Sequence, residues 1–298
     1  MTVFQNVADR LSGFSVLNAD MSKYTTFRMG GPADILIQPR NEEELLLSLE
    51  LCKGGGVPYY IIGNGSNLLV RDKGIRGAVI RIAENFASVS IEGNAVRANT
   101  GVLLSALANL TLKNGLMGLE WAAGIPGTFG GALAMNAGAY GGEISSCVKS
   151  VRVLRGGEIS DIKVKDGDFA YRFSRFAYPE CIALAGTLEL QPDDGGANER
   201  KLKYSAERKS KQPLSFPSAG SVFKRPEGYF AGALIESAGL KGYSIGGAQV
   251  SEKHAGFIIN TGGATARDVL DLIDYVKARV LENSGVALEP EIKIIGEE

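Results

Sequence analysis

The sequence contains one histidine and three cysteines in 298 residues. A Ser-His-Asp triad could therefore exist only through His254, and a metal centre with several histidines is excluded. Cys52, Cys147 and Cys181 are odd in number and show no CxxC spacing, which argues against a disulfide framework and a zinc site. We therefore expect no bound metal. We expect the three cysteines to be buried and His254 to have a structural or peripheral role.

The chain also lacks an excess of positive or negative charge: its formal net charge at pH 7 is −1. Neither nucleic acid nor an anionic membrane surface is therefore expected as a partner. The apolar run LLLSLELC after Asn41 is interrupted by polar residues and is too short to cross a bilayer. The first residues, MTVFQNVADRL, do not resemble a secretory signal. We expect a soluble, cytoplasmic monomer.

Segments with strand and helix character alternate along the chain. One helix is expected to begin after Asn41, which suits a cap, and to end at Gly54. The best-marked helix begins after Thr265, which can form a capping box with Asp268, and ends at Gly285. Further strands are expected at ADILIQP, PYYIIG, GAVIRI, AVRAN, SVRVLR, CIALAGTLEL, GFIIN and EIKIIG, and further helices at residues 102–114 and 230–238.

A charged segment, DDGGANERKLKYSAERKSKQP, follows Pro192 and is typical of a surface loop leading into a solvated helix. A chain of 298 residues with 45% hydrophobic content can form two domains. We place the boundary in this segment, so that residues 1–195 form the first domain and residues 196–298 form the second.

The segment from Ala122 to Glu143, AAGIPGTFGGALAMNAGAYGGE, has seven glycines, six alanines and almost no charge. Glycine lacks the Cβ that would block a ligand, while Ile125 and Phe129 supply apolar anchors that a flexible linker would lack. A phosphate-bearing ligand could lie along this surface and accept hydrogen bonds from its N–H groups. A tightly packed structural loop explains the composition equally well.

Two more glycine-bearing segments precede it. IIGNGSNLLV, from Ile61, is a strand that runs into a glycine turn with polar side chains suited to a pyrophosphate. TTFRMGGPA, from Thr25, places a glycine pair beside a hydroxyl and a cation. Neither a Walker loop nor a GxGxxG motif opening a helix is present, which disfavours ATP hydrolysis and a Rossmann nicotinamide site. A plain Asn-Gly turn is the alternative for the first segment.

Seven motifs occur between about Tyr24 and the C-terminus, namely TTFRMGGPA, IGNGSNLLV, GIPGTFGGALAMNAGAYGGE, YRFSRF, PSAGSVFKRP, GLKGYSIGGAQVS and LEPEIKIIG. In sequence and in order they resemble the UDP-N-acetylenolpyruvoylglucosamine reductase family. The resemblance implies an α+β protein with an FAD-binding domain of the vanillyl-alcohol-oxidase (PCMH-type) fold, itself two α+β subdomains, and a smaller α+β substrate-binding domain.

The resemblance also implies an activity and two cofactors. NADPH reduces FAD and leaves, and UDP-N-acetyl-enolpyruvoylglucosamine is then reduced to UDP-N-acetylmuramate for peptidoglycan synthesis. We expect the cofactor-binding residues to be Arg28, Gly63, Asn64, Gly65, Ser66, Asn67, Gly124, Gly127, Thr128, Gly130, Gly131, Asn136, Gly138 and Ala139.

The chemistry requires a cation, an acid and a proton donor. Hydride adds to C3 of an enol ether that is not electrophilic by itself, so electron density must be drawn into the adjoining carboxylate. By resemblance, Arg172 and Glu291 stabilise the enolate-like intermediate and Ser221 protonates C2. Without the resemblance, Arg172 could belong to a surface ion pair, Ser221 to a turn, and Glu291 to a solvent-facing strand.

The substrate's diphosphate requires further cations. The resemblance supports Lys211 and Arg225 as phosphate contacts, and a solvated basic face is the alternative. Only 39 positions separate Arg172 from Lys211, which is too short for the extra tyrosine-bearing loop of one branch of the family. We expect the shorter type. The substrate-binding residues expected are Tyr171, Lys211, Lys224, Arg225, Tyr140 and Tyr243.

Two other functions fit parts of the sequence. An FAD-dependent oxidase of the same fold acting on another substrate would need only the first domain. A nucleotide-sugar binding protein that has lost the flavin would need no catalytic residues. The joint presence of PSAGSVFKRP and LEPEIKIIG favours the reductase.

Overall fold

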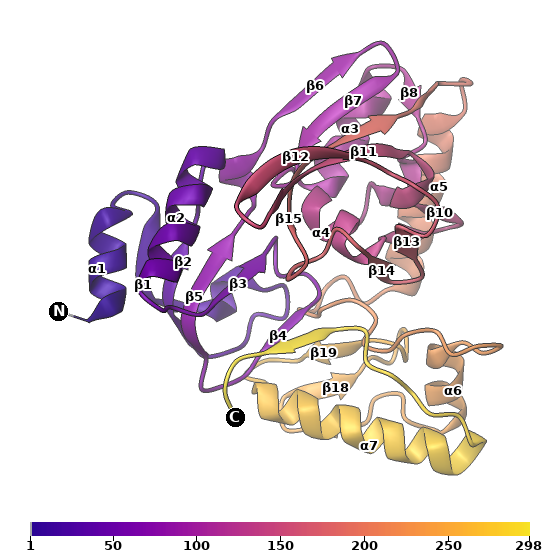
Figure 1. Ribbon diagram of the computed structural model, residues 1–298. Coiled ribbons are helices and arrows are strands. Elements are labelled where there is room, and N and C mark those ends of the chain that lie inside the picture. The colour runs from indigo at the N-terminus through magenta and orange to yellow at the C-terminus, as the bar shows by residue number, and fades with distance from the viewer. Residues whose placement is uncertain (1) are drawn as a thin grey trace. The chain divides into compact units, whose positions relative to one another are not determined.

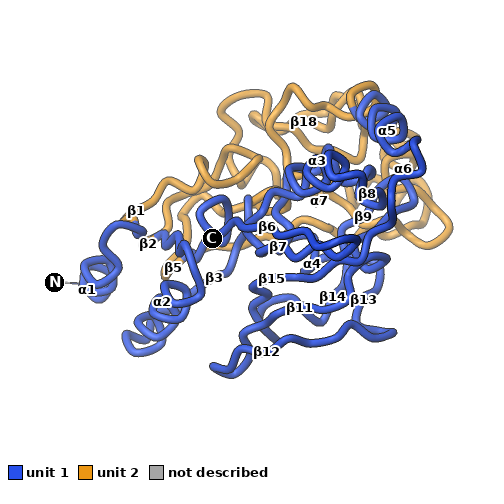
Figure 2. The backbone as a smooth tube through the Cα atoms, turned by 90° about the horizontal axis from the view of Figure 1, so that it is seen from above, with its two compact units in different colours: residues 1–15, 36–64, 79–208 blue, residues 16–35, 65–78, 209–298 orange. Residues whose placement is uncertain are grey.

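The computed structural model describes residues 2–298. The chain divides into two compact units, coloured in Figure 2, and each unit is assembled from separated segments. Unit 1 contains residues 1–15, 36–64 and 79–208, and unit 2 contains residues 16–35, 65–78 and 209–298. The domain boundary predicted after residue 195 stays a prediction.

Helices and strands are mixed throughout the described chain, which confirms the α+β prediction (Figure 1). The helices are α1 (Val3–Arg10), α2 (Glu42–Gly54), α3 (Leu104–Lys113), α4 (Phe129–Met135), α5 (Ala197–Lys211), α6 (Ala231–Ser237) and α7 (Ala266–Ser284), with short 3-10 helices η1 (Met21–Tyr24), η2 (Glu84–Phe86), η3 (Glu120–Ala122) and η4 (Ile144–Ser146).

The strands are short, and most belong to antiparallel pairs. In chain order they are β1 (Ser15–Asp20), β2 (Pro32–Ile37), β3 (Tyr59–Ile62), β4 (Leu68–Val70), β5 (Ile75–Arg81), β6 (Val89–Glu92), β7 (Ala95–Asn99), β8 (Leu116–Met117), β9 (Gly138–Ala139), β10 (Gly142–Glu143), β11 (Val148–Arg155), β12 (Glu158–Lys163), β13 (Phe169–Ala170), β14 (Phe173–Ser174), β15 (Ile182–Glu189), β16 (Gln191–Pro192), β17 (Ser244–Ile245), β18 (Ala248–Val250), β19 (Ile258–Asn260) and β20 (Lys293–Ile295).

Unit 1 is built on the antiparallel sheet β12-β11-β15-β7-β6. Helix α4 packs against β15 and β7 and buries Phe129 completely. Gly186 of β15 makes room for it, since a Cβ there would lie 2.7 Å from the ring's Cζ. Burial of such a ring contributes roughly 1.5–3 kcal/mol. The glycine-rich segment is thus anchored to the sheet by the buried side chain of Phe129.

Unit 2 has the antiparallel sheet β17-β18-β19, against which α7 packs. The residues predicted to form the apolar face of α7 are all buried, namely Val269, Ile273, Val276 and Val280. The same core contains Phe27, Met29 and Leu69 from the N-terminal third of the chain. Strand β4 also pairs in parallel with β20. Unit 2 is therefore closed by residues from both ends of the sequence.

The predicted caps of two helices are confirmed. Asn41 Oδ1 accepts a hydrogen bond from Glu44 N at 2.9 Å at the start of α2. Thr265 and Asp268 form the predicted capping box, and Gly285 ends α7 with φ 70°. These local signals depend only on neighbouring residues, which is why the sequence predicts them well.

Helix α4 lies inside the glycine-rich segment, where the sequence predicted a backbone surface and no helix. Strands β2 and β3 flank α2 in the sequence, and β5 lies between them in the sheet of order β1-β2-β5-β3. Sequence order alone could not reveal that a later strand inserts between them.

Candidate functional site

The turn after β3 meets the glycine-rich segment within unit 1. Asn64 Nδ2 donates a hydrogen bond to the carbonyl of Pro126 at 2.7 Å, and Arg81 Nη2 donates to Asn64 Oδ1 at 3.2 Å. A Cβ at Gly63 would collide with Thr128 Oγ1. Two of the three predicted glycine-bearing segments are therefore packed directly on each other.

Helix α4 begins inside this contact. Thr128 caps it, because its Oγ1 accepts a hydrogen bond from Gly131 N at 3.2 Å. A Cβ at Gly130 would lie 2.7 Å from Thr100 Cβ, whereas a Cβ at Gly131 would meet only Thr128 Oγ1 at 3.6 Å. Glycine at position 130 therefore serves packing, while the surface at Gly131 is open.

Close protein neighbours also explain several other glycines predicted to bind cofactor. A Cβ at Gly124 would lie 2.7 Å from Arg208 Cδ, and one at Gly138 would lie 2.8 Å from the carbonyl oxygen of Gly142. The carbonyl of Gly127 accepts a hydrogen bond from Leu104 N at 2.9 Å. Their predicted cofactor contacts stay predictions.

The glycine-rich segment is joined to the YRFSRF motif by Asn136. This residue is the αL cap of α4 and is 2% exposed. Its Nδ2 donates to the carbonyl of Ala170 at 3.1 Å, and its Oδ1 accepts from Ser145 N at 3.2 Å. Ala139 follows in β9, which pairs with β10. Both ends of the Asn136 amide are thus hydrogen-bonded to backbone groups of unit 1.

Arg172 lies at the tip of the hairpin formed by β13 and β14. Ala170 and Phe173 face each other in register, which leaves Tyr171 and Arg172 in the turn. Arg172 has φ 55°, and its guanidinium carbon lies 5.0 Å from the centre of the Tyr171 ring. The flanking aromatics are exposed, Tyr171 by 55% and Phe173 by 56%, while Arg172 is half-buried. The site thus presents a cation beside two exposed aromatic side chains.

Ser221 and Glu291 are brought together in unit 2, although 70 positions separate them (291 minus 221). Glu291 N donates to the carbonyl of Val222 at 2.7 Å, and Ser221 forms a bridge with Phe257. Asn67 Nδ2 donates to the carbonyl of Glu291 at 3.3 Å. The predicted proton donor, the predicted acid and one predicted cofactor residue therefore lie on adjoining backbone.

The turn that contains Gly65 and Ser66 also belongs to unit 2. Thr26 N donates to the carbonyl of Gly65 at 3.3 Å, and a Cβ at Gly65 would collide with the carbonyl of Tyr24. Arg28 in the same loop has φ 54°. The TTFRMGGPA and GNGSN motifs are therefore packed together here.

The predicted phosphate-binding cations have other contacts. Lys224 forms an ion pair with Glu289, and the Arg225 guanidinium lies 4.0 Å from the centre of the Phe230 ring. Lys211 is the last residue of α5. Tyr243, predicted near the substrate, stacks on Tyr275 at 4.4 Å. A carboxylate neighbour thus contacts Lys224, and aromatic neighbours contact Arg225 and Tyr243.

Arg81, which orients Asn64, was not among the predicted site residues. Arg81 is only 8% exposed and pairs with Glu84 at 2.8 Å. A signal was present, because Arg81 follows the apolar run Ala78–Ile80 at the end of β5, where a buried arginine must have partners.

The cysteines are buried, and the histidine is half-buried. Cys52, Cys147 and Cys181 are buried and unpaired, as predicted, and burial raises the pKa of Cys52 to about 11 and that of Cys147 to about 12. Their thiolates are strongly disfavoured at neutral pH. His254 Nδ1 accepts a hydrogen bond from Gly256 N at 3.1 Å, and burial lowers its pKa.

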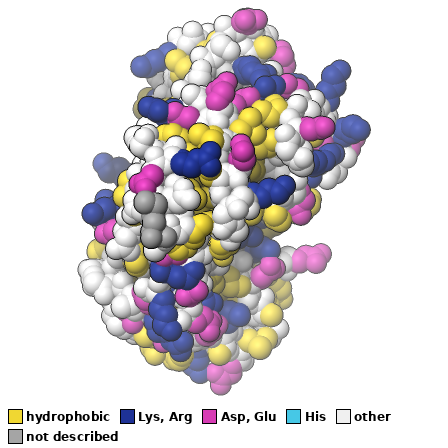
Figure 3. All heavy atoms as spheres, turned by 60° about the vertical axis from the view of Figure 1, so that its left-hand side comes forward, with side chains coloured by type: hydrophobic (Ala, Val, Ile, Leu, Met, Phe, Trp, Pro, Cys, Tyr) yellow, Lys and Arg dark blue, Asp and Glu magenta, His cyan; other side chains and the backbone are white. Residues whose placement is uncertain are grey.

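The face in Figure 3 carries interspersed positive and negative side chains. Among residues 2–298, no helix is both long and apolar enough to span a membrane. In the same range no group of His, Cys, Asp and Glu is arranged to hold a metal ion.

Family models match most of the chain. A model described as FAD binding domain matches residues 33–162, and one described as UDP-N-acetylenolpyruvoylglucosamine reductase, C-terminal domain, matches residues 212–295. The predicted FAD-binding fold is confirmed. The second match begins next to Lys211 and includes Ser221 and Glu291.

Similar proteins carry the same description over nearly their full length. The chain is 50% identical to the UDP-N-acetylenolpyruvoylglucosamine reductase of Clostridioides difficile (strain 630), covering 99% of this chain and 98% of the relative. It is 50% identical to that of Alkaliphilus oremlandii (strain OhILAs), covering 95% and 94%. The crystal structure of UDP-N-acetylenolpyruvylglucosamine reductase from Thermus caldophilus superposes with a TM-score of 0.80 at 36% identity, covering 94% of this chain and 97% of that one.

Proposed function

The chain belongs to the UDP-N-acetylenolpyruvoylglucosamine reductase family, and on that premise we propose how its residues perform the reaction. The protein is an FAD-dependent oxidoreductase that reduces UDP-N-acetyl-enolpyruvoylglucosamine to UDP-N-acetylmuramate, a step in peptidoglycan precursor synthesis. NADPH is the reductant. We further propose that it acts as a cytoplasmic monomer without nucleic acid or membrane partners, which its net charge of −1 supports.

The residues of unit 1 fit FAD. A long ligand needs an open stretch of backbone beside polar groups, and the surface at Gly131 has room that a side chain would fill. Thr128 and Asn64 flank this surface, and both are held by hydrogen bonds to the fold. Bound FAD would accept two electrons from NADPH and supply them as hydride to the enol ether.

Arg172 and Glu291 are proposed to polarise the substrate. A carbanion at C2 is stabilised when the adjoining carboxylate takes up electron density, and a fixed guanidinium favours that charge. The positive φ of Arg172 supports this role, because strained residues persist where the surrounding structure determines them. Glu291, as the acid, would hold the carboxylate end through a hydrogen bond.

Ser221 is proposed to donate the proton to C2. A serine is a poor acid in water, so its competence must come from the developing carbanion next to it and from a relay behind it. Ser221 is only half-buried and follows Gly220, whose φ of 80° turns the chain. Lys211, Lys224 and Arg225 lie in the flanking sequence and are proposed to bind the diphosphate.

The observation that carries the proposal is the pairing of Ser221 and Glu291 inside the matched C-terminal domain. The hydrogen bond from Glu291 N to the carbonyl of Val222, 2.7 Å long, fixes the two on adjoining backbone. A flavin oxidase with another substrate has no reason to keep this arrangement. A binding protein that has lost flavin would need no proton donor.

Anaerobic half-reactions test the function directly. Purified protein should show flavin absorbance, bleach when NADPH is added, and recover its colour when the enolpyruvyl sugar nucleotide follows. UDP-N-acetylmuramate should then be found by mass spectrometry. A colourless preparation would contradict flavin binding, and bleaching without recovery would contradict the substrate.

A further inference from the structure

We propose that Arg208 on α5 binds a phosphate group of a ligand that lies along the glycine-rich segment of unit 1. The inference rests on the proposed function, since the phosphates available there belong to FAD, NADPH and the UDP-sugar. It adds a residue that the sequence analysis did not identify.

Arg208 crosses the bare backbone of Gly124. A Cβ at Gly124 would lie 2.7 Å from Arg208 Cδ, 3.3 Å from its Nε and 3.6 Å from its Nη1. Any side chain at position 124 would therefore push the arginine away. Glycine is needed here so that a guanidinium can lie against the main chain.

The guanidinium lacks the partners that a buried cation requires. Arg208 Nε is buried and makes no hydrogen bond within the described chain. Burial lowers the pKa of Arg208, and among residues 2–298 the group that opposes this shift is Tyr140 rather than a carboxylate. A desolvated, unpaired arginine costs stability, so a structure that retains one indicates that an anion supplies the missing partner.

Aromatic residues form the next part of this surface. Tyr204 lies one helical turn before Arg208 on α5 and stacks on Tyr140 of the glycine-rich segment, with ring centres 4.7 Å apart and planes 12° apart. Tyr140 holds φ 53° to reach this position. The same face of α5 thus contacts the glycine-rich segment at two successive turns.

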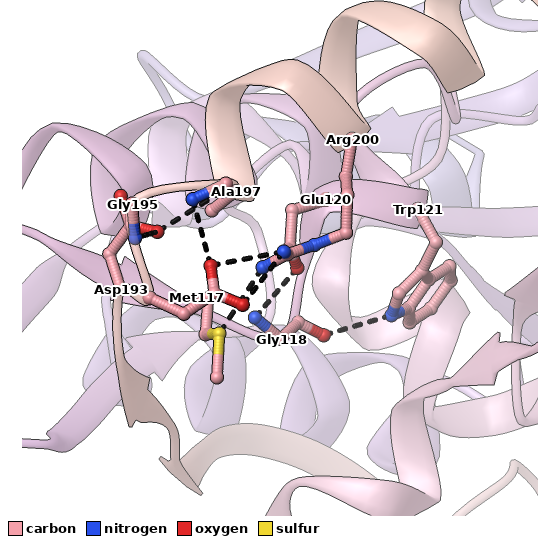
Figure 4. Close-up of polar contacts among 10 residues, drawn as sticks. Met117, Gly118, Glu120, Trp121, Asp193, Gly195, Ala197 and Arg200 are labelled. Carbon is pink, nitrogen blue, oxygen red and sulfur yellow. Dashed lines mark hydrogen bonds and ion pairs between the residues drawn. The ribbon is translucent and has the colours of Figure 1, made fainter.

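The start of α5 is held by an ion-pair cluster (Figure 4). Arg200 donates to Glu120 at 2.8 Å and to Asp194 at 2.9 Å, and Glu120 Oε2 accepts from Gly118 N at 2.7 Å. Asp193 Oδ1 accepts from Ala197 N at 3.1 Å at the helix start.

This cluster fixes the register of α5 on the segment. Glu120 and Gly124 are four residues apart, and their partners Arg200 and Arg208 are eight apart on the helix, about 12 Å. Arg208 is therefore placed by contacts that lie elsewhere, which leaves its own guanidinium available. It is also partly exposed, so a ligand can reach it.

A phosphate suits these features better than a carboxylate side chain would. Its oxygens can accept from a planar guanidinium and from neighbouring backbone N–H groups at once. Hydrogen bonds to charged groups are worth more than neutral ones, and losing one should weaken binding by at least ~10-fold.

The test compares Arg208→Met with Lys203→Met in the full-length protein. Methionine keeps an unbranched chain over Gly124 without the charge, and Lys203 is an exposed residue of the same helix whose loss removes the same charge. FAD release from the purified holoenzyme is measured by flavin fluorescence, UDP and NADP⁺ affinities by calorimetry, and stability by thermal unfolding.

We expect the apoprotein of Arg208→Met to melt no lower than the wild-type apoprotein, because an unpaired buried cation has been removed, yet the variant should bind at least one of the three ligands ~10-fold or more weakly. Lys203→Met should match wild type in every measurement. The ligand that loses affinity identifies the phosphate. If it is FAD, reconstitution with riboflavin, which has the same ring and no phosphate, should be unaffected.

Unchanged affinities for all three ligands would overturn the proposal, as would an equal loss for FAD and riboflavin. Should Arg208→Met not fold, Arg208→Lys keeps the charge without the planar fork, and wild-type affinities in that variant would also overturn it. If the wild-type protein itself binds no FAD, the proposed function fails, while the UDP and NADP⁺ measurements still decide the role of Arg208.

Discussion

Unusual backbone conformations coincide with predicted site residues. Within residues 2–298, five residues other than glycine have positive φ, and four of them, Arg28, Asn136, Tyr140 and Arg172, belong to the predicted sites. Such conformations cost about 1–3 kcal/mol each and persist where packing imposes them. The coincidence supports the site prediction independently of any motif, because φ was not part of the sequence argument.

Ser221→Ala should separate the two half-reactions. A proton donor is needed only when the substrate is reduced, so anaerobic bleaching by NADPH should stay close to wild type. Recovery of flavin colour with the enolpyruvyl substrate should slow at least ~10²-fold, the lower end of what a positioned general acid contributes. Stopped-flow absorbance measures both steps.

Ser221→Cys is the matched control, since a thiol can still donate a proton, and it should regain part of the lost rate. Wild-type recovery in the alanine variant would make Ser221 a turn residue and leave Glu291 as the next candidate donor.

Gly131→Val should give a folded protein that purifies with little FAD. A branched side chain at Gly131 would fill the open surface beside Thr128. Gly54→Val is the control, because Gly54 also lies in a helix and a Cβ there has no atom within 4 Å. The ratio of flavin absorbance to protein absorbance reports occupancy. Full FAD occupancy in Gly131→Val would mean that the cofactor does not lie against Gly131.

Gly65→Val does not offer the same test. Gly65 has φ 63°, and a Cβ there would collide with the carbonyl of Tyr24. Valine would strain the backbone itself, so any FAD loss in this variant would report misfolding.

At the scale of the element, side chains accept hydrogen bonds from the N–H groups at the start of α7. Asp72 accepts hydrogen bonds from Ala266 N at 2.8 Å and Arg267 N at 2.9 Å, and Thr265 Oγ1 accepts from Asp268 N at 3.1 Å. Thr265 N donates in turn to Asp268 Oδ2 at 3.0 Å. All four N–H groups that a helix start leaves without intrahelical partners are therefore satisfied. The Asp268 carboxylate also accepts from Gly247 N at 3.2 Å, which ties the helix to its sheet.

Removing this cap should make stability depend less on pH. Backbone hydrogen bonds from Thr265 hold the pKa of Asp268 below its usual 3.8. A carboxylate with a lowered folded pKa stabilises the protein above its unfolded pKa, and that contribution is lost as the pH falls through the folded value. The difference in unfolding free energy between wild type and Asp268→Asn should therefore be constant above about pH 5 and narrow below about pH 4.

Denaturant unfolding at several pH values measures this difference. Asp274→Asn, at an exposed position of α7, is the control and should change little at any pH. Thr265→Ala should cost ~1 kcal/mol at pH 7. A pH-independent difference for Asp268→Asn would show that the charge is not involved.

Elements and their caps were largely predictable from sequence, whereas the contacts between elements were not. Asn41, Thr265 and Gly285 signal helix ends through neighbouring residues alone. The clash that excludes a side chain at Gly63 depends on Thr128, 65 positions away (128 minus 63). Composition predicted that the glycine-rich segment forms a surface for a ligand. Helix α4 was missed because its seven residues include two glycines, which weaken any helical pattern.

At the scale of the molecule, the second unit depends on the beginning of the chain. Phe27, Met29 and Leu69 are at most 5% exposed and belong to the same core as α7. Each buried side chain of this size contributes roughly 1.5–3 kcal/mol. Together they match much of the ~5–15 kcal/mol by which a domain is stable.

A fragment of residues 196–298 should therefore not fold by itself. It lacks these three side chains and the strand β4 that pairs with β20. We expect no cooperative thermal transition and a weak near-ultraviolet circular dichroism signal, while the full-length chain shows both. A sigmoidal melting curve for the fragment would mean that the core closes without the N-terminal segments.

The parallel pairing of β4 with β20 has a consequence for synthesis on the ribosome. Val70 pairs with Ile295, 225 positions later (295 minus 70). Translation at ~5–20 residues per second separates the appearance of these two residues by roughly 10–45 s. Unit 1 contains no residue beyond 208, so all of its residues are synthesised before the final strand. Leu69 and Phe27 must wait in the nascent chain for the final strand, and during that interval they expose apolar surface that chaperones bind.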